Sequence, residues 1–200
     1  GNMTSQLREW QEDFGRSYTD RNVVDWQTRY PAFQQMLEGI MIQRALEVGC
    51  NRGHNLVALS KLFGEDCSLA GIEPNAYSLS QAKEAIRCAQ LLPGSAYGIP
   101  FDDESFDLVF TAGVLIHIPL TDLRTALGEI YRVSRRYILA LEYYAEEETV
   151  IHYRAHDDLL WKRDFLGHYQ AAFPSLKLAR SGYWESEYGF DRTSWWLLEK

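Results

Sequence analysis

Short apolar runs alternate with segments of helical periodicity along most of the chain, and this alternation restricts the fold more than any other feature. The runs typical of buried strands are residues 44–48, 68–72, 106–111 and 137–142. The segments with apolar side chains at helical spacing are residues 55–63, 77–91 and 120–133. Strands that alternate with helices of this length form parallel βαβ units. We therefore expect an α/β fold with helices on both faces of an open sheet.

The C-terminal part follows a different pattern. Residues 165–173 are helical in periodicity, and Pro174 ends that segment. Residues 176–183 and 193–199 are strand-like, and the short stretch between them cannot hold the dozen or more residues of a parallel crossover. The prediction is thus a Rossmann-like open sheet, mostly parallel, that ends in an antiparallel C-terminal hairpin.

Length and composition favour one globular unit. With 200 residues, of which 46% are hydrophobic, the chain can bury one sizeable core. We expect residues 1–38, which are polar with spaced aromatic side chains, to form a helical lid segment. Residues 39–200 would form a single domain with an insertion near 143–163.

Charge and cysteine usage exclude several classes of protein. A net charge of −8 argues against a nucleic-acid or membrane partner, and no apolar run reaches the roughly 18 residues of a membrane span. The three cysteines form no Cys-x-x-Cys pair, so we expect free thiols and no metal site. Without a signal-peptide pattern, the expected location is cytoplasmic.

The loop after the first expected strand has the composition of a ligand-binding loop. Residues 46–56 read LEVGCNRGHNL, with Gly49 and Gly53 between a strand and a helix. Glycine permits positive φ and lets a ligand lie against bare backbone. Amides at the start of the next helix favour a carboxylate or phosphate, and open α/β sheets bind ligands at the carboxyl ends of their strands. A purely structural turn remains the alternative for such a loop taken alone.

The spacing within this loop argues against a dinucleotide. The fingerprint Gly-x-Gly-x-x-Gly, begun at Gly49, requires glycine where the chain has Asn51 and His54. The loop instead resembles the acidic-x-Gly-x-Gly-x-Gly loop of class I S-adenosylmethionine-dependent methyltransferases, beginning at Glu47. Asn51 then replaces one glycine, and asparagine tolerates left-handed backbone angles.

Two downstream segments extend this resemblance. Glu73 follows Gly53 at the spacing of about 20 residues expected for an acid that accepts hydrogen bonds from a ribose. Pro74 would turn the chain over the adenine. At residues 94–101, GSAYGIPF resembles the adenine-binding segment of these enzymes, with Ser95 in place of its usual acid.

A further segment leads to the expected position of the transferred methyl group. Residues 102–110 resemble the Asp-x-x-Phe-Asp-x-Val segment before the fourth strand of these enzymes, and that strand delivers small residues to the methionine end. His117 follows them. It is either a base or donor near the methyl group, or a residue that caps and stabilises the loop.

A narrower resemblance covers nearly the whole chain from Phe14 onward. The sequence is similar to the pseudaminic acid biosynthesis-associated methylases at residues 13–22, 46–56, 105–118, 137–144, 153–156, 162–165 and 195–200. This resemblance implies S-adenosyl-L-methionine as cofactor and S-adenosyl-L-homocysteine as product. It also implies that Tyr18, Arg21 and Asn22 fold over the cofactor, with the arginine pairing to its carboxylate. An amphipathic helix that merely packs on the sheet is the alternative.

The expected insertion is the candidate acceptor site. Arg154 and Arg163 can hold an anionic group, with Tyr144 and Tyr153 beside them. The candidates for taking a proton from the acceptor are His117, Tyr143, His152 and His156. A polar surface loop held by its own ion pairs is the competing interpretation.

The hypothesis from sequence is methyl transfer to an oxygen or nitrogen of a small polar acceptor, such as an amino sugar or nucleotide sugar of surface-glycan (nonulosonic acid) biosynthesis. The expected cofactor-binding residues are Tyr18, Arg21, Asn22, Glu47, Gly49, Cys50, Asn51, Gly53, Asn55, Glu73, Pro74, Asn75, Ser95, Ala96, Tyr97, Thr111, Ala112, Gly113 and His117. Two rivals are a non-catalytic cofactor-binding partner in a glycan pathway and a nicotinamide oxidoreductase.

Overall fold

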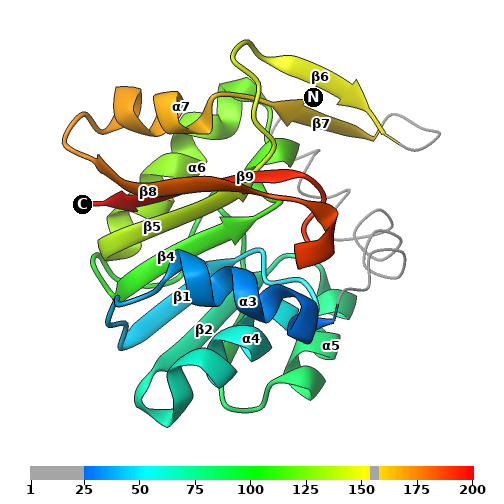
Figure 1. Ribbon diagram of the computed structural model, residues 1–200, viewed down its shortest axis with the longest axis vertical. Helices are drawn as coiled ribbons and strands as arrows, with labels where there is room; N and C mark the ends of the chain where they lie inside the picture. The colour runs from blue at the N-terminus through cyan, green and yellow to red at the C-terminus, as the bar shows by residue number, and fades with distance from the viewer. Residues whose placement is uncertain (1–24, 154–157) are drawn as a thin grey trace.

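A computed structural model describes residues 25–153 and 158–200, and its main element is a seven-stranded sheet with the order β3-β2-β1-β4-β5-β9-β8 (Figure 1). The strands are β1 Arg44–Val48, β2 Ser68–Glu73, β3 Gln90–Pro93, β4 Phe106–Ala112, β5 Ser134–Glu142, β8 Lys177–Trp184 and β9 Thr193–Glu199. The first five are parallel, whereas β9 is antiparallel to both β5 and β8. The prediction of a mostly parallel sheet that ends in an antiparallel pair is confirmed.

Helices cover both faces of this sheet, as the sequence predicts (Figure 1). The helices are α3 Trp26–Met36, α4 His54–Phe63, α5 Ala76–Ala85, α6 Leu120–Val133 and α7 Phe165–Ala172. Because side chains alternate along a strand, Ala45 packs in the cluster of α3, α4 and α5, while Leu46 packs in the cluster of α6 and α7. Three 3₁₀ turns, η1 Gly64–Asp66, η2 Leu115–His117 and η3 Ser186–Tyr188, join these elements.

Helix α3 is part of the domain core. Asp25 caps its first turn by accepting a hydrogen bond from the Gln27 amide at 3.0 Å. Pro31 lies inside the helix without ending it. Phe33 is fully buried and meets Phe110 of β4 edge-to-face, with 5.7 Å between ring centroids. The described part of the expected lid segment therefore packs on the sheet.

One predicted helix is too long. The expected helix at residues 77–91 ends at Ala85, and Ile86 has extended backbone with a φ of −138°. Leu91 and Leu92 instead belong to β3, which pairs with β2 at the sheet edge. The prediction failed because two apolar residues before Pro93 are too few to show a strand period.

The expected insertion contains a small sheet that composition did not reveal. Strands β6 Thr149–His152 and β7 Leu159–Lys162 pair antiparallel and form a hairpin separate from the main sheet (Figure 1). We call it the β6–β7 hairpin. The imidazole Nδ1 of His117 donates to the Leu159 carbonyl oxygen at 3.3 Å, which ties η2 to this hairpin.

Candidate active site

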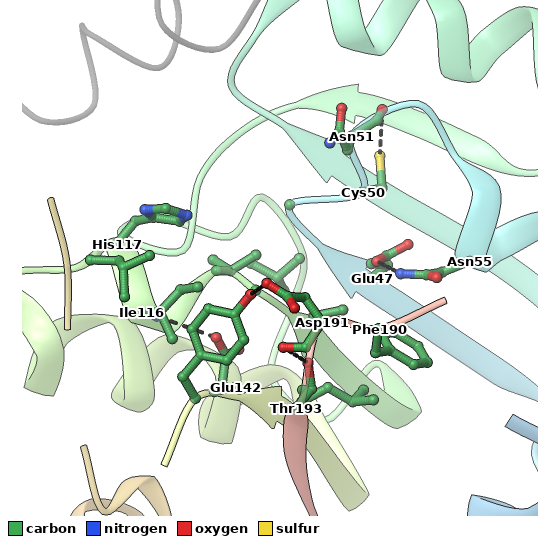
Figure 2. Close-up of a pocket in the computed structure, with 18 of the residues that line it drawn as sticks. Glu47, Cys50, Asn51, Asn55, Ile116, His117, Glu142, Phe190, Asp191 and Thr193 are labelled. Carbon is green, nitrogen blue, oxygen red and sulfur yellow. Dashed lines mark hydrogen bonds between the residues drawn. The ribbon is translucent and has the colours of Figure 1, made fainter. Parts of the chain in front are cut away.

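A cavity of about 570 Å³ lies at the carboxyl ends of β1, β2, β4 and β5. This is the position at which open α/β sheets bind ligands. One part, the loop half, is lined by residues 47–52, 54, 55, 73, 74, 78 and 95–97. The other part, the hairpin half, is lined by residues 112–114, 116–118, 141–143, 151, 153, 160, 162 and 189–193. Arg29 of α3 lies beside the loop half. Figure 2 shows Glu47 and Asn51 on one side of the cavity and Glu142 and Asp191 on the other.

The β1–α4 loop needs its glycines for steric reasons. Gly49 has a φ of +77°, and a Cβ there would lie 2.6 Å from Cγ2 of Val114. Gly53 has a φ of +86°, and its Cβ would approach Ala82 to 3.2 Å. Asn51 has a φ of 51°, so it adopts the left-handed conformation expected from its place in the motif. Asn51 thus adopts the left-handed backbone conformation that a glycine would adopt at this position of the motif.

Glu73 links the two ligand loops of the loop half. Its Oε1 accepts a hydrogen bond from the Asn51 amide at 2.9 Å, and its Oε2 accepts one from the Asn75 amide at 2.8 Å. Burial raises the pKa of this carboxyl to about 7, although the two hydrogen bonds from backbone amides act to lower it. Asn75 accepts from the Ser78 amide as the N-cap of α5 and does not line the cavity.

Glu47 begins a chain of hydrogen-bonded side chains, of which the sequence predicted Glu47 and Asn55 but not Arg29. Its Oε2 accepts a hydrogen bond from Nδ2 of Asn55 at 2.8 Å, and Oδ1 of Asn55 accepts one from Nη1 of Arg29 at 2.9 Å. Burial raises the Glu47 pKa to about 8, against the lowering effects of Asn55 and Arg29. Within residues 25–153 and 158–200, its buried Oε1 has no hydrogen-bond partner. That oxygen can therefore serve a ligand.

Arg29 is a cavity residue that sequence analysis missed. Besides its bond to Asn55, its Nε donates to the carbonyl oxygen of Gly189 at 3.0 Å. Its guanidinium lies 4.4 Å from the ring centroid of Phe190. Arg29 thus joins α3 to the loop before β9. No local motif marks it, since its partners lie far away in the sequence.

The predicted adenine-binding segment lines the loop half. Ser95, Ala96 and Tyr97 all reach the cavity. The hydroxyl oxygen of Ser95 accepts a hydrogen bond from the Tyr97 amide at 3.2 Å, within a tight turn closed by a bridge to Gly98. The serine therefore also shapes the turn.

Glu142, at the end of β5 in the hairpin half, is a polar residue of the expected acceptor segment to which the sequence assigned no role. Its Oε2 accepts from the Thr111 hydroxyl at 2.7 Å, and its Oε1 accepts from the Ile116 amide at 3.2 Å. Burial raises its pKa to about 7, while bonds from Thr111 and the backbone of η2 lower it. Glu142 thus holds η2 in place beneath the cavity, and Thr111 supports it from outside the lining.

His117 lines the hairpin half but is 96% buried, with a relative exposure of 4%. Burial lowers its pKa to about 4, against the raising effect of the Leu159 carbonyl. The imidazole is therefore uncharged at neutral pH. Its contact with the β6–β7 hairpin matches the loop-stabilising alternative of the sequence analysis.

The hairpin half carries aromatic and charged side chains from three segments. The Tyr143 hydroxyl donates to Oδ2 of Asp191 at 3.2 Å, which joins the end of β5 to the loop before β9. Tyr153 and Lys162 line the cavity from the β6–β7 hairpin. Phe190 adds an apolar surface between the two halves.

Several predicted site residues lie away from the cavity. Arg163 is buried, where its guanidinium pairs with Glu148 and donates to the Ile118 carbonyl oxygen at 2.6 Å. It does not line the cavity, so this placement does not fit the prediction that it holds an acceptor anion. His152 and Tyr144 are exposed and also lie outside the lining.

The remaining predictions divide clearly. The predicted residues that line the cavity are Glu47, Gly49, Cys50, Asn51, Asn55, Glu73, Pro74, Ser95, Ala96, Tyr97, Ala112, Gly113, His117, Tyr143 and Tyr153. Those that support it from behind are Gly53, Asn75 and Thr111. Those outside the described residues are Tyr18, Arg21, Asn22, Arg154 and His156.

Residues 25–153 and 158–200 contain no cluster of three His, Cys, Asp or Glu side chains able to hold a metal ion. In the same ranges, no helix has the length and apolarity required to span a bilayer.

Part of this chain is similar in sequence to known proteins. Residues 46–137 match the sequence family described as a methyltransferase domain. An uncharacterised methyltransferase of Schizosaccharomyces pombe is 34% identical over 122 residues, which cover 55% of this chain and 43% of that protein. The chain spans about half the length of the curated relatives it matches.

Solved structures show the same fold. Phosphoethanolamine N-methyltransferase 1 of Haemonchus contortus, in complex with phosphoethanolamine and S-adenosylhomocysteine, matches with a TM-score of 0.78 at 14% identity, over 100% of this chain and 50% of that one. A protein of Pyrococcus horikoshii OT3 matches with a TM-score of 0.70 at 13% identity, over 96% and 98% of the two chains. The chain therefore shares the fold of these two proteins, and its residues 46–137 are similar in sequence to the methyltransferase domain family.

Proposed function

We propose that this chain transfers a methyl group from S-adenosyl-L-methionine to an oxygen or nitrogen of a small acceptor. When bound, the cofactor supplies a methyl group on a positively charged sulfur, which a nucleophilic oxygen or nitrogen displaces. The observation that carries the proposal is the buried Oε1 of Glu47, which has no hydrogen-bond partner among the described residues and lies at a cavity lined by the methyltransferase-type loop.

The residues of the loop half fit this cofactor chemically. A pKa of about 8 keeps Glu47 largely protonated in the ligand-free chain, and an ammonium group at its Oε1 would lower this pKa and favour the carboxylate. Each side-chain oxygen of Glu73 accepts one hydrogen bond from a backbone amide and can accept a second one from a ribose hydroxyl. Ser95 and Tyr97 provide backbone and side-chain groups for a heterocyclic base.

The chain's main contribution to the reaction would be alignment. Two reactants held in one cavity react as a unimolecular pair, which lowers the entropic part of the barrier. Glu142 holds η2, and His117 joins η2 to the β6–β7 hairpin, so the two walls of the hairpin half are held in a defined relation. Neither residue needs to take a proton for this role.

The identity of the acceptor is a finer proposal. An amino sugar or nucleotide sugar of surface-glycan biosynthesis is supported by the sequence resemblance to pseudaminic acid-associated methylases. The Haemonchus protein was solved with phosphoethanolamine, which is an acceptor of another class. The fold is therefore compatible with several acceptors.

Calorimetric titration tests the cofactor assignment. We expect S-adenosylmethionine and S-adenosylhomocysteine to bind and NAD not to bind. Glu47→Gln should weaken the binding of S-adenosylhomocysteine at least tenfold, about 1.4 kcal/mol, because the neutral amide forms no ion pair with an ammonium. Glu65→Gln, at an exposed position of η1, is the matched control.

The proposal is wrong if saturating S-adenosylmethionine gives no heat of binding in calorimetry and no shift of the thermal unfolding temperature. Tighter binding of NAD would revive the oxidoreductase. Mass spectrometry of a nucleotide-sugar and amino-sugar panel, with a gain of one methyl group as the signal, separates an enzyme from a non-catalytic cofactor-binding partner.

A further inference from the structure

We propose that Lys162 binds an anionic group of the methyl acceptor, so that the hairpin half selects small acids with an apolar body over their neutral analogues. This inference rests on the proposed methyltransferase function and names an acceptor class that competes with the sugar acceptors considered there. It begins from the direction of the side chains on the β6–β7 hairpin.

Strand alternation places Lys162 on the cavity side of the hairpin. Side chains at i and i+2 of a strand share a face, and Leu160 and Lys162 of β7 both line the cavity. Ile151, directly opposite Leu160 in the register, lines it from β6. Trp161 and Arg163 do not line it. The cation of β7 that faces the cavity is thus Lys162, whereas the sequence suggested its neighbour Arg163.

The two neighbouring cations differ in their partners. Arg163 is paired with Glu148 and donates to a backbone carbonyl. For Lys162, no carboxylate oxygen in residues 25–153 and 158–200 lies within 4.0 Å of the ammonium. Its contact is the Tyr143 ring, whose centroid lies 5.8 Å from Nζ. An ammonium in this position attracts a negatively charged ligand group.

The surfaces around Lys162 suit an apolar body. Ile116 and Ile118 line the cavity from η2 and the residue after it, and Ile151 and Leu160 line it from the hairpin. Small-molecule sites commonly combine such an apolar lining with a few polar groups that set orientation.

The carboxylates of this half already have partners. Asp191 accepts from the Tyr143 hydroxyl, and Glu142 accepts from Thr111 and Ile116. Arg192 adds a second cation at the exposed side of the lining. The hairpin half can therefore take an anion at Lys162.

The test uses matched pairs of probes and four proteins. The probe pair for binding is 4-hydroxybenzoate and 4-hydroxybenzamide, which share a ring and a hydroxyl and differ in charge. The proteins are the wild type, Lys162→Met, Lys162→Arg and the control Lys177→Met, at an exposed position of β8. Ligand-observed NMR, with and without S-adenosylhomocysteine, measures binding directly. Mass spectrometry with S-adenosylmethionine measures methylation over a panel of hydroxy and amino acids and their amides.

We expect the wild type and Lys177→Met to bind acids at least tenfold more tightly than amides. Lys162→Met should lose this preference, and Lys162→Arg should keep most of it. Calorimetry should give all four proteins the same affinity for S-adenosylhomocysteine, because Lys162 lies outside the loop half.

Equal binding of acids and amides by the wild type overturns the inference, as does a preference that survives Lys162→Met. If S-adenosylhomocysteine binds but no acid is preferred, the inference fails and the proposed function stands. If the chain binds acids through Lys162 but does not bind S-adenosylmethionine, the anion site stands and the methyltransferase proposal fails.

Discussion

The two halves of the cavity are built in different ways. The loop half comes from three loops that follow consecutive parallel strands, within residues 47–97. Its order depends on backbone amides that point at carboxylates, as at Glu73, and on glycines with positive φ. The hairpin half comes from segments spread from residue 112 to residue 193, joined by side-chain contacts.

This difference teaches where general and specific recognition reside. Local loops after parallel strands can preserve one binding geometry through a short motif. Side chains gathered from distant segments can change one by one without loss of the sheet, so they suit the recognition of a particular acceptor. Variants that affect one half and spare the other test this division.

The largest effect should follow from Gly49→Ala. The new methyl group would collide with Val114, and alanine is strained at this φ. We expect a loss of about 2 to 4 kcal/mol in the free energy of unfolding. Calorimetry should also show cofactor affinity reduced by about two orders of magnitude. Gly128→Ala in α6, where a Cβ meets nothing within 4 Å, should be neutral or slightly stabilising. Equal behaviour of the two variants would contradict the steric argument.

The next effect is a dependence of stability on pH. Burial raises the pKa of Glu142 from 4.5 to about 7, so the folded chain keeps a proton there that the unfolded chain loses first. The contribution of this group to the free energy of unfolding is therefore fully present below pH 4.5. It falls by up to about 3 kcal/mol as the pH rises to about 7. Denaturant unfolding of the ligand-free chain between pH 4.5 and 8 measures this slope. Glu142→Gln should reduce this slope without removing it, because burial also raises the pKa of Glu73 to about 7 and of Glu47 to about 8. An unchanged slope would exclude Glu142 as one of its sources.

A smaller effect should separate the two halves. Arg163→Met leaves Glu148 without its partner and removes the bond to Ile118. We expect about 2 kcal/mol of destabilisation, less than for a wholly buried pair because Glu148 is partly exposed. Hydrogen exchange should rise in β6 and β7, while the affinity for S-adenosylhomocysteine stays within twofold. A matching loss of cofactor affinity would show that the halves are not independent. Arg163→Lys serves as the charge-retaining comparison.

The smallest effect is expected at the acceptor side alone. Tyr143→Phe removes the hydrogen bond to Asp191 between two partly exposed groups and should cost less than about 1 kcal/mol of stability. Once an acceptor is known, its KM should rise a few-fold with cofactor affinity unchanged. Asp191→Asn, which keeps a hydrogen-bond acceptor, is the companion variant. A large loss of cofactor binding in Tyr143→Phe would place this tyrosine in the other half.

Much of the loop half could be predicted because its signals are local. Asn51 adopts the left-handed conformation that its motif position requires, and Glu73 reaches the loop at the expected spacing. Strand alternation with helices also predicted the sheet and its antiparallel end. Strand β3 was missed because pairing with β2, and not a sequence period, makes residues 90–93 a strand.

The hairpin half was harder, because its residues acquire their roles through pairing. Glu142 has no motif, and its partners lie 26 or more positions away in the chain. The same holds for Arg29, whose hydrogen bonds to Asn55 and Gly189 connect the two halves. Composition suggested Arg163 and Tyr144 as acceptor-binding residues. In the structure it is Lys162 that lines the cavity, because of its position in the alternation of side chains along β7.

The sequence by itself determined the order of strands β1, β2, β4, β5, β8 and β9 and of the helices between them, the backbone conformation of the β1–α4 loop and the acid at the end of β2. These follow from periodicity and from the angles that glycine and asparagine allow. Only the tertiary structure decided which cation faces the cavity and which carboxylate holds η2. The reason is physical: a side chain's direction depends on the register of its strand, and its burial depends on segments that meet only after folding.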